Sequence, residues 1–584
     1  MKPSNSTLSF TGFLASFLTQ SGNFGLVLAL LVFSFSVAPA AHGEDDIVLT
    51  AMEQEISRSM KGFGEQADPS PYFIGYQITD SRNGSIRASH GALQRSTETH
   101  GRFLNVTVRV GDYELDNTRG VRGEPGVMSL FRRGGIIPVS IDGDLDSLRA
   151  SLWQETNRQY RIAVEDLEKI RASLEIKVEE ESTVGDFTRE ESQVTLDPRA
   201  PYSLDKELWE GRLKAFSRMF LDYPEILTSQ VDLVIVATTK YIVNSEGTRL
   251  RFGETRLRLA LSASTRADDG MNLYRYGAFH AAEWSQMPTA EEVRKEVRRL
   301  ARELTELRAS PASEAYSGPA ILSGRAAGVF FHEVLGHRVE GHRQRDEFEG
   351  QTFARKLGEK ILPDFISILD DPTRPDLGGQ PLMGHFRYDD QGVPSQSVTI
   401  VEDGVLRNFL LSRRPIGSFT SSNGHGRRQP GGVVTARQGN LIVEAGERVP
   451  YAELRRKLLE MVRRQEKDYG LVFEDIAGGF TETMRFGPQT FQVLPLMVYR
   501  VFADGRPDEL VRGLGIVGTP LTVLGKIVGA SDQSKIFNGV CVAESGAVPV
   551  SATSPALLIS EIEVQKQPKG FDRPPLLPPP AIEY

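Results

Sequence analysis

Cysteine is almost absent from this sequence: Cys541 is the only one in 584 residues. The chain therefore has no internal disulfide, and a large core has to supply its stability. An excess of positive charge is also missing. The formal net charge is −9, and no long basic stripe with interleaved aromatic residues is present, which argues against a general nucleic-acid binder. The single cysteine leaves three alternatives: inert core residue, nucleophile or metal ligand.

Long apolar runs are scarce as well. Residues 24–37 form a short one, followed by Ala38-Pro39-Ala40 and then an acidic segment. This order predicts a signal peptide over residues 1–40 and export to the periplasm or the extracellular space. A retained membrane anchor is the alternative, because the long leading segment carries only Lys2 as a positive charge. No later run approaches eighteen apolar residues, so we expect no membrane contact for the mature form.

The chain is longer than a single core usually supports, and helical and strand periodicities are mixed along it. We expect an α+β protein. Residues 45–310 would form an N-terminal α/β-mixed domain with an antiparallel sheet, including short strands at Tyr72–Ile78 and Gly84–Leu93. Residues 311–566 would form a β-rich C-terminal domain that carries a helix over residues 325–337, and residues 567–584 a proline-rich tail.

That helix carries the segment His332-Glu333-Val334-Leu335-Gly336-His337. Imidazole is the commonest protein ligand for zinc, and a carboxylate beside it can accept a proton from metal-bound water. Five residues separate the two histidines, however, which puts them ~140° apart on a regular α-helix. Two solutions remain: a π-type widened turn, or a helix that ends near Gly336.

A catalytic zinc usually has three protein ligands. Nearby candidates for the third are Glu340, His342, Glu347 and Glu349, and Cys541 is a distant one. The spacing does not choose among them. A surface helix with two solvated histidines is the alternative to a metal site, although the apolar Val329-Phe330-Phe331 before His332 argues for burial.

The segment from Gly318 through His332-Glu333-x-x-Gly336-His337-x-x-Glu340-Gly341 resembles the metal-site segment of TldD-type members of the TldD/PmbA peptidase family, once labelled modulators of DNA gyrase. The similarity continues in family order over residues 45–565. It is carried by Asn244-Ser245-Glu246-Gly247, Arg427-Arg428, Gly478-Gly479, Val511-Arg512-Gly513 and the segment from Cys541 to Val550.

This resemblance implies zinc held by His332, His337 and Cys541, with Glu333 as the general base for metal-bound water. It also implies unfolded or extended peptides as substrates, and a homodimer or a heterodimer with a PmbA-type subunit. Two other readings stay open: a non-catalytic scaffold or partner subunit that the metal stabilises, and a thiol enzyme that uses Cys541 as nucleophile.

Two positions depart from the family pattern. Family members tend to read Gly-Lys-x-Gly-Gln after the cysteine, whereas here Val542-Ala543-Glu544-Ser545-Gly546 follows, and His342 stands where aspartate is usual. Elsewhere, His425 and Arg427-Arg428 lie in a segment that we expect to be a polar loop. There the arginines are either solvated or hold a substrate carboxylate.

Overall fold

A computed structural model describes residues 46–121, 134–175, 184–485, 487, 489–567, 575 and 577. These residues belong to one compact unit that begins at Asp46. The predicted signal peptide, and the predicted tail apart from Gln567, Pro575 and Leu577, lie outside them. The domain division near residue 310 stays a prediction.

None of the helices within the described ranges combines the length and the apolar character needed to span a bilayer.

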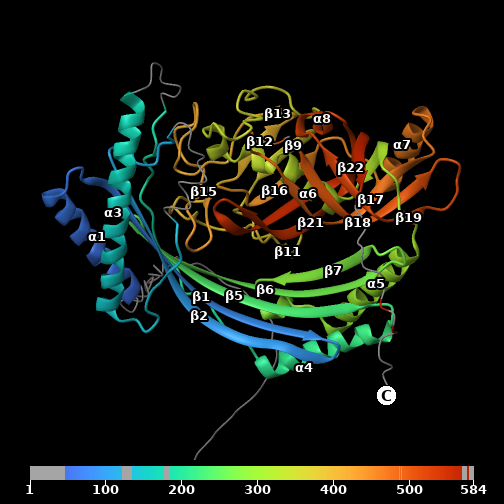
Figure 1. Cartoon of the computed structure of the whole chain (residues 1–584), viewed down its shortest axis with the longest axis horizontal. Coiled ribbons are helices and arrows are strands. Elements are labelled where there is room, and N and C mark those ends of the chain that lie inside the picture. Colours follow the sequence, from blue (N-terminus) through green and yellow to red (C-terminus); the bar gives the residue numbers. More distant parts are fainter. Residues whose placement is uncertain are drawn as a thin grey trace, which may run out of the picture. The chain divides into compact units, whose positions relative to one another are not determined.

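The chain has a mixed α+β architecture, as predicted, with one large sheet from each half of the sequence (Figure 1). The helices are α1 Ile47–Gln66, α3 Leu145–Glu175, α4 Lys206–Arg218, α5 Ala290–Ala309, α6 Gly324–Val334, α7 Tyr451–Arg464 and α8 Pro520–Leu524. Short 3₁₀ turns are η1 Met219–Asp222, η2 Trp284–Gln286, η3 Gly336–Val339 and η4 Gly341–Gln344.

The strands of the N-terminal half are β1 Pro71–Ser89, β2 Ala92–Val110, β3 Ile137–Pro138, β4 Val194–Leu196, β5 Thr228–Asn244, β6 Arg249–Arg266 and β7 Asn272–Ala281. The strands of the C-terminal half are β8 Tyr316–Leu322, β9 Ile366–Asp370, β10 Asp376–Leu377, β11 Gln380–Pro381, β12 Val398–Glu402, β13 Val405–Leu406, β14 Gly426–Arg427, β15 Thr435–Ala436, β16 Asn440–Ala445, β17 Tyr469–Thr481, β18 Phe491–Phe502, β19 Glu509–Val511, β20 Leu514–Gly518, β21 Ile527–Ala543 and β22 Gly546–Lys566.

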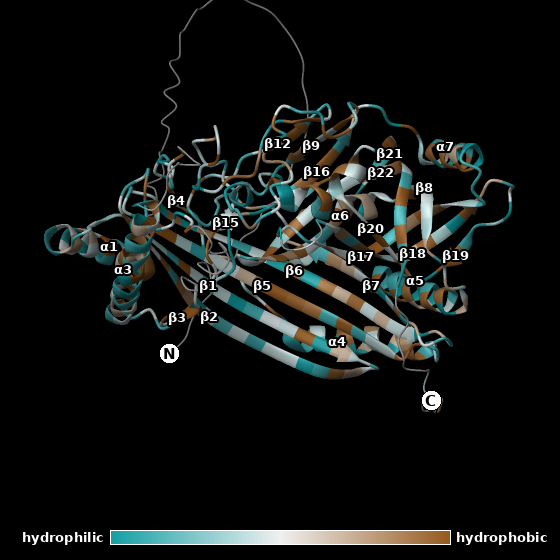
Figure 2. Cartoon of the chain, turned by 45° about the horizontal axis from the view of Figure 1, so that its top comes forward, coloured by the Kyte–Doolittle hydropathy of each residue, from teal (hydrophilic) through white to brown (hydrophobic). Residues whose placement is uncertain are grey.

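The N-terminal sheet runs in the order β3-β2-β1-β5-β6-β4, and β7 also pairs with β6. Along β5 and β6 buried residues alternate with partly exposed ones, which Figure 2 shows as bands of hydrophobic and hydrophilic colour. This alternation gives the sheet one apolar face, and the core residues of α1, α3, α4 and α5 pack against it. The opposite, more polar face is left for contacts with the C-terminal half.

Both segments predicted as strands, residues 72–78 and 84–93, lie largely in strands, but the predicted break between them is wrong. They belong mainly to one long strand, β1, which pairs with β2 through an almost continuous antiparallel register. Gly84 suggested a break, but its backbone continues the strand. A side chain there would come within 2.8 Å of Ile235, Leu204 and Tyr202. The glycine therefore allows close packing and does not form a turn.

The C-terminal sheet runs in the order β13-β12-β9-β16-β22-β20-β18-β17-β8, and β8 also pairs with β22. Five strands therefore form a closed ring of paired strands: β22, β20, β18, β17 and β8. The largest apolar core of the described chain lies between these strands and α6.

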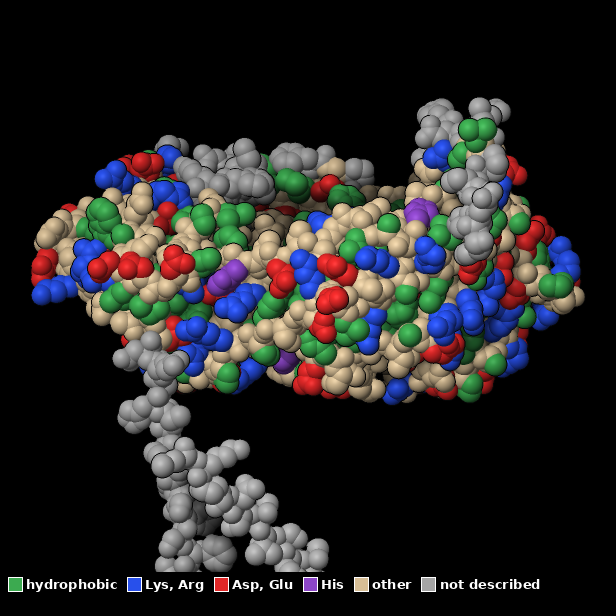
Figure 3. Space-filling view, turned by 90° about the horizontal axis from the view of Figure 1, so that it is seen from below, with side chains coloured by type: hydrophobic (Ala, Val, Ile, Leu, Met, Phe, Trp, Pro, Cys, Tyr) green, Lys and Arg blue, Asp and Glu red, His purple; other side chains and the backbone are tan. Residues whose placement is uncertain are grey.

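Charged groups on the solvent face are mixed. On the face shown in Figure 3, Lys and Arg are interspersed with Asp and Glu. This face therefore offers no extended field of one sign to attract a polyanion.

Candidate metal centre

Helix α6 brings the central motif into the core. Ser323 caps its N-terminus by accepting a hydrogen bond from the backbone N–H of Ala326. Apart from Arg325, every residue of the helix is buried. Gly328 lies so close to β22 that an added Cβ would be 2.9 Å from the carbonyl oxygen of Ala552. The helix carrying His332 and Glu333 is thereby fixed against the long strand β22.

The helix ends at Val334, two residues before Gly336, so the predicted extension through His337 is wrong and the alternative of an early end is confirmed. Leu335 is the C-cap residue, and a 3₁₀ turn, Gly336–Val339, follows. Any side chain at Gly336 would overlap Gln438. With this change from α-helix to 3₁₀ turn, the rings of His332 and His337 lie 4.9 Å apart between centroids.

Arg338 satisfies the carbonyl groups exposed where α6 ends. Its guanidinium donates to the carbonyl oxygen of Glu333 at 2.8 Å, and to Thr481 and Glu482 of the segment that includes β17. Unpaired carbonyls at a helix C-terminus are costly when buried, so this arginine stabilises the early stop. A basic residue just after the helix is a sequence signal for this end, and the prediction of a helix through His337 overlooked it.

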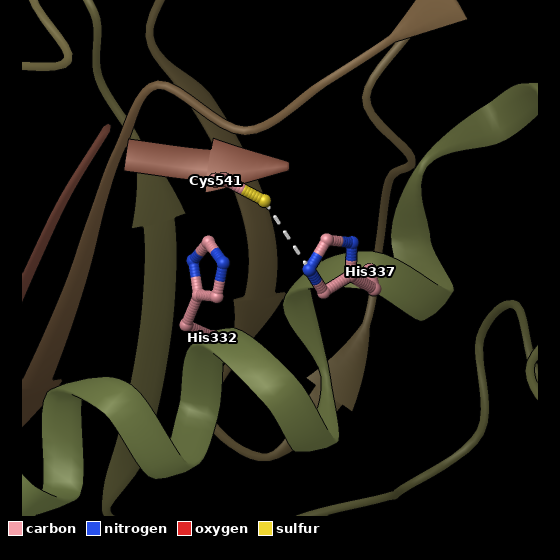
Figure 4. A group of neighbouring side chains, drawn as sticks. All are labelled: His332, His337 and Cys541. Carbon is pink, nitrogen blue, oxygen red and sulfur yellow. Dashed lines mark hydrogen bonds between the residues drawn. The ribbon is translucent and has the colours of Figure 1, made fainter. Parts of the chain in front are cut away.

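The structure brings His332, His337 and Cys541 together from α6, the following turn and β21 (Figure 4). The sulfur of Cys541 lies 3.3 Å from Nε2 of His337. The two imidazole rings are 4.9 Å apart between centroids and nearly perpendicular, at 81°. One ligand atom from each of the three side chains lies within 4.8 Å of the other two.

These residues fit a tetrahedral zinc ion. Zn–N and Zn–S bonds of about 2.0–2.3 Å place tetrahedral ligand atoms roughly 3.5 Å apart. The sulfur of Cys541 and Nε2 of His337 are 3.3 Å apart, and all three ligand atoms lie within 4.8 Å of one another. The lowered pKa of Cys541 is also consistent with a cation at this position. Burial alone would raise the pKa of the Cys541 thiol, but the adjacent imidazoles hold that pKa well below its ordinary value. The buried thiolate thus requires a cationic neighbour, which a metal ion would supply.

Glu333 lies at the edge of this group. One carboxylate oxygen is 4.0 Å from Nε2 of His337, and burial raises the pKa of Glu333 above its ordinary value. A carboxylate of raised pKa is a stronger base for proton transfer near neutral pH. Its side chain packs directly against Gly479 of β17, where an added Cβ would overlap it. Gly479 thus leaves the space that the Glu333 side chain occupies.

A second carboxylate, Glu340, orients His337 from the far side. It accepts a hydrogen bond from Nδ1 of His337 at 3.3 Å, which leaves Nε2 directed toward Cys541. Burial alone would raise the pKa of Glu340, but His337, Arg343 and Arg437 lower it to about 2. Glu340 therefore stays ionised and fixes the ring orientation.

Arg437 connects this carboxylate to the cysteine-bearing hairpin. Its guanidinium lies 3.3 Å from Glu340 and donates to the carbonyl oxygen of Cys541 at 3.0 Å. It also donates to Ser545 and Gly546 at the turn between β21 and β22. One buried side chain thus connects the segment after α6 to the β21–β22 hairpin. Nothing in the local sequence pattern indicated this role of Arg437.

The other local candidates for a third ligand are engaged elsewhere. Glu340, His342 and Glu544 also form a cluster of potential ligands, but Arg343 ion-pairs with both carboxylates, so a guanidinium already supplies the cation. Glu349 pairs with the same arginine. His342, which stands where aspartate is usual in the family, contacts Glu544 directly. Glu347 lines the cavity above the site.

The expectations for the polar loop are wrong. His425 is fully buried and its ring contacts Asn423 and Asp370. Arg427 donates to the backbone carbonyls of Gln438 and Pro549, and Arg428 donates to Gln77 of β1. These arginines are therefore neither solvated nor available to a substrate. Arg428 links the two halves of the chain, and Arg427 links segments within the C-terminal half.

The site opens into a cavity of about 1100 Å³. Its lining combines α6 (Val329, His332, Glu333), β17 (Ala477 to Thr481), β21 (Phe537 to Ala543) and the polar face of the N-terminal sheet (Arg258, Tyr274, Tyr276). A cavity of this size accepts a peptide-sized ligand. Both halves of the sequence therefore contribute to the same site.

A buried group of two histidines and one cysteine beside a carboxylate, at the base of a large cavity, can hold a catalytic metal ion with one coordination position open. Residues 315–566 match the family model described as the PmbA/TldA metallopeptidase C-terminal domain. Residues 315–566 of this chain therefore belong to the TldD/PmbA metallopeptidase family.

The names of curated relatives agree with this family. A metalloprotease of Methanothermobacter thermautotrophicus is 28% identical over 340 residues, 57% of this chain and 69% of that protein. A zinc metalloprotease TldD homolog of Saccharolobus solfataricus is 26% identical over 249 residues, 42% of this chain and 51% of that protein. The matched region spans about half the length of several of these relatives.

Solved structures share the fold. A candidate modulator of DNA gyrase from Thermotoga maritima aligns with 88% of this chain and 99% of its own, at a TM-score of 0.57 and 18% identity. TldE from Thermococcus kodakarensis aligns with 88% of this chain and all of its own, at a TM-score of 0.55 and 15% identity. At these identities the likeness concerns the fold alone.

The packing of Glu333 against β17 predicts different effects for two adjacent glycines. Gly479→Ala should lower the free energy of unfolding by roughly 1–3 kcal/mol, because the new methyl group overlaps Glu333. Gly478→Ala should be neutral or stabilising by up to about 1 kcal/mol, because nothing lies within 4 Å of its added Cβ. Urea denaturation of both variants measures the difference. Equal stabilities would contradict the described packing.

Proposed function

We propose that this protein is a zinc metallopeptidase of TldD type that hydrolyses unfolded or extended peptides. The observation that carries this proposal is the convergence of His332, His337 and Cys541 beside Glu333, at the base of the cavity. The names of the relatives support it, since they are metalloproteases and one is a zinc metalloprotease.

His332, His337 and Cys541 would hold the metal. Bound zinc would supply a Lewis acid that acidifies water and polarises a peptide carbonyl. Glu333 accepts the proton of the attacking water at its carboxylate and then delivers it to the leaving amine. Glu340 keeps Nε2 of His337 facing the metal position, and Arg437 holds the backbone of Cys541.

The strand β17 supports an extended peptide as the substrate. Residues 477–481 line the cavity and pair with β18 along one edge, while β8 pairs only with residues 471–473. The other edge of this segment is therefore available for main-chain hydrogen bonds with a substrate in strand conformation. Binding through the backbone selects unfolded segments, because folded proteins keep their main-chain groups paired.

Replacement of the proposed base tests the mechanism. Glu333→Gln should reduce kcat for an unstructured peptide by about 10²–10⁴-fold while zinc content stays near that of the parent protein, because the amide cannot accept the proton. Peptide cleavage followed by mass spectrometry, together with metal analysis, provides the measurement. Glu402→Gln on β12 is the control, since this exposed carboxylate lies outside the cavity.

Cleavage that persists in Glu333→Gln would contradict the assigned base. Metal removal distinguishes the scaffold alternative. A peptidase whose fold does not depend on zinc should lose activity on chelation, keep its circular dichroism spectrum and regain activity with added zinc. A protein that unfolds on chelation and never cleaves peptides would be a scaffold.

We also propose that the protein is exported and dimeric. The apolar segment before Ala38-Pro39-Ala40 supports export, and the TldE-like fold supports pairing with itself or with a PmbA-type subunit. The protein recovered from cells should begin at Ala41, and light scattering should give the mass of two chains. An intact N-terminus in the cytoplasm, or a monomeric mass with no co-purifying subunit, would contradict these proposals.

A further inference from the structure

Large apolar side chains are exposed on both walls of the cavity. Phe480 on β17 is 64% exposed, and Val540 and Val542 on β21 are 64% and 75% exposed. Tyr274 of β7 also lines the cavity and is 48% exposed. Most apolar side chains of this size are buried in a folded protein, so their collection around one cavity indicates a surface that a ligand covers.

These side chains adjoin the proposed catalytic group. Phe480 follows Gly479, the residue against which Glu333 packs. Val540 and Val542 flank Cys541, whose sulfur lies 3.3 Å from His337. Because consecutive residues of a strand point to opposite faces, these side chains project from the faces of β17 and β21 opposite to Gly479 and Cys541, and the same cavity borders both sets. An extended peptide beside these strands would place alternate side chains against the apolar ones.

Charged residues line another part of the cavity. Arg345 pairs with Asp186, and Arg343 pairs with Glu349 and Glu544. Because these groups already satisfy one another, they provide little net charge for selecting a charged substrate. The exposed apolar side chains have no comparable partner, and covering them would remove apolar surface from water.

We propose that Phe480, Val540 and Val542 form an apolar subsite that selects peptides with large apolar side chains beside the cleaved bond. The inference rests on the proposed function in taking an extended peptide as the ligand. It adds a preference of side chain to recognition through the backbone, and unfolded segments are the chains that expose such residues. The expected substrates are therefore unfolded segments rich in leucine, valine or phenylalanine.

Binding measurements test this preference without requiring turnover. Two fluorescein-labelled unstructured peptides, identical except that serine replaces leucine, are titrated against zinc-loaded Glu333→Gln protein by fluorescence anisotropy. The leucine peptide should bind about tenfold more tightly, which is typical of discrimination in an apolar pocket. Phe480→Ser and Val542→Ser should each reduce this ratio to about threefold or less.

Val528→Ser is the matched control, because Val528 is an exposed valine on the same strand outside the cavity. It should leave the ratio unchanged. Equal affinity for both peptides, or an unchanged ratio in both cavity variants, would overturn the subsite. Dissociation of a dimer in these variants without any change in ratio would instead assign the surface to a second copy.

The outcome is separable from the proposed function. If the parent protein cleaves no peptide, the peptidase proposal fails, whereas the affinity ratio still decides the subsite. If it cleaves both peptides with equal kcat/KM and binds them equally, the subsite alone fails.

Discussion

The contact between Cys541 and His337 is the interaction on which the site depends. It joins residues separated by 204 positions, one on β21 and the other in the turn after α6. Neither side chain could be buried alone at low cost, because a thiolate or an imidazolium in the core requires a partner. Together with His332 they form a group whose charge and spacing suit one cation. The strands, the buried helix and the arginines around them keep these three side chains at that spacing.

The early end of α6 makes this contact geometrically accessible. On a continuous helix His337 would point well away from His332. Gly336 lets the chain pass close to Gln438, and Arg338 satisfies the carbonyl of Glu333. The same stop leaves Glu333 on the last turn, where Gly479 accommodates its side chain. A single local departure from helical geometry therefore positions both the second histidine and the carboxylate.

Features that depend on neighbouring residues were predictable from the sequence. Asp46 caps α1, and Thr289 forms a capping box with Glu292 at the start of α5. The α+β class, the buried motif and the alternative of an early helix end also followed from local patterns. Cys541 did not. Spacing alone did not favour Cys541 as the third ligand over Glu340, His342, Glu347 and Glu349. Only the family resemblance selected it.

Features that depend on tertiary contacts were mispredicted or missed. Gly84 resembles a strand break in the sequence, but in the structure its missing side chain leaves the space in which Tyr202 and Leu204 pack on β1. His425 and Arg427 look like polar loop residues, yet they are buried between chain segments. Gly479 and Arg437 gave no local signal, because their partners, Glu333 and Glu340, lie far away in the sequence. The limit is physical: close packing and buried ion pairs are set by which segments meet in space.

The central claim is that His332, His337 and Cys541 bind one zinc ion. X-ray absorption at the zinc edge, on purified protein with its metal content quantified, measures the ligand set directly. The account predicts about one zinc per chain, with two nitrogen neighbours from imidazole and one sulfur neighbour at about 2.3 Å. A stoichiometric zinc site without a sulfur neighbour, or protein that takes up no zinc, would contradict it.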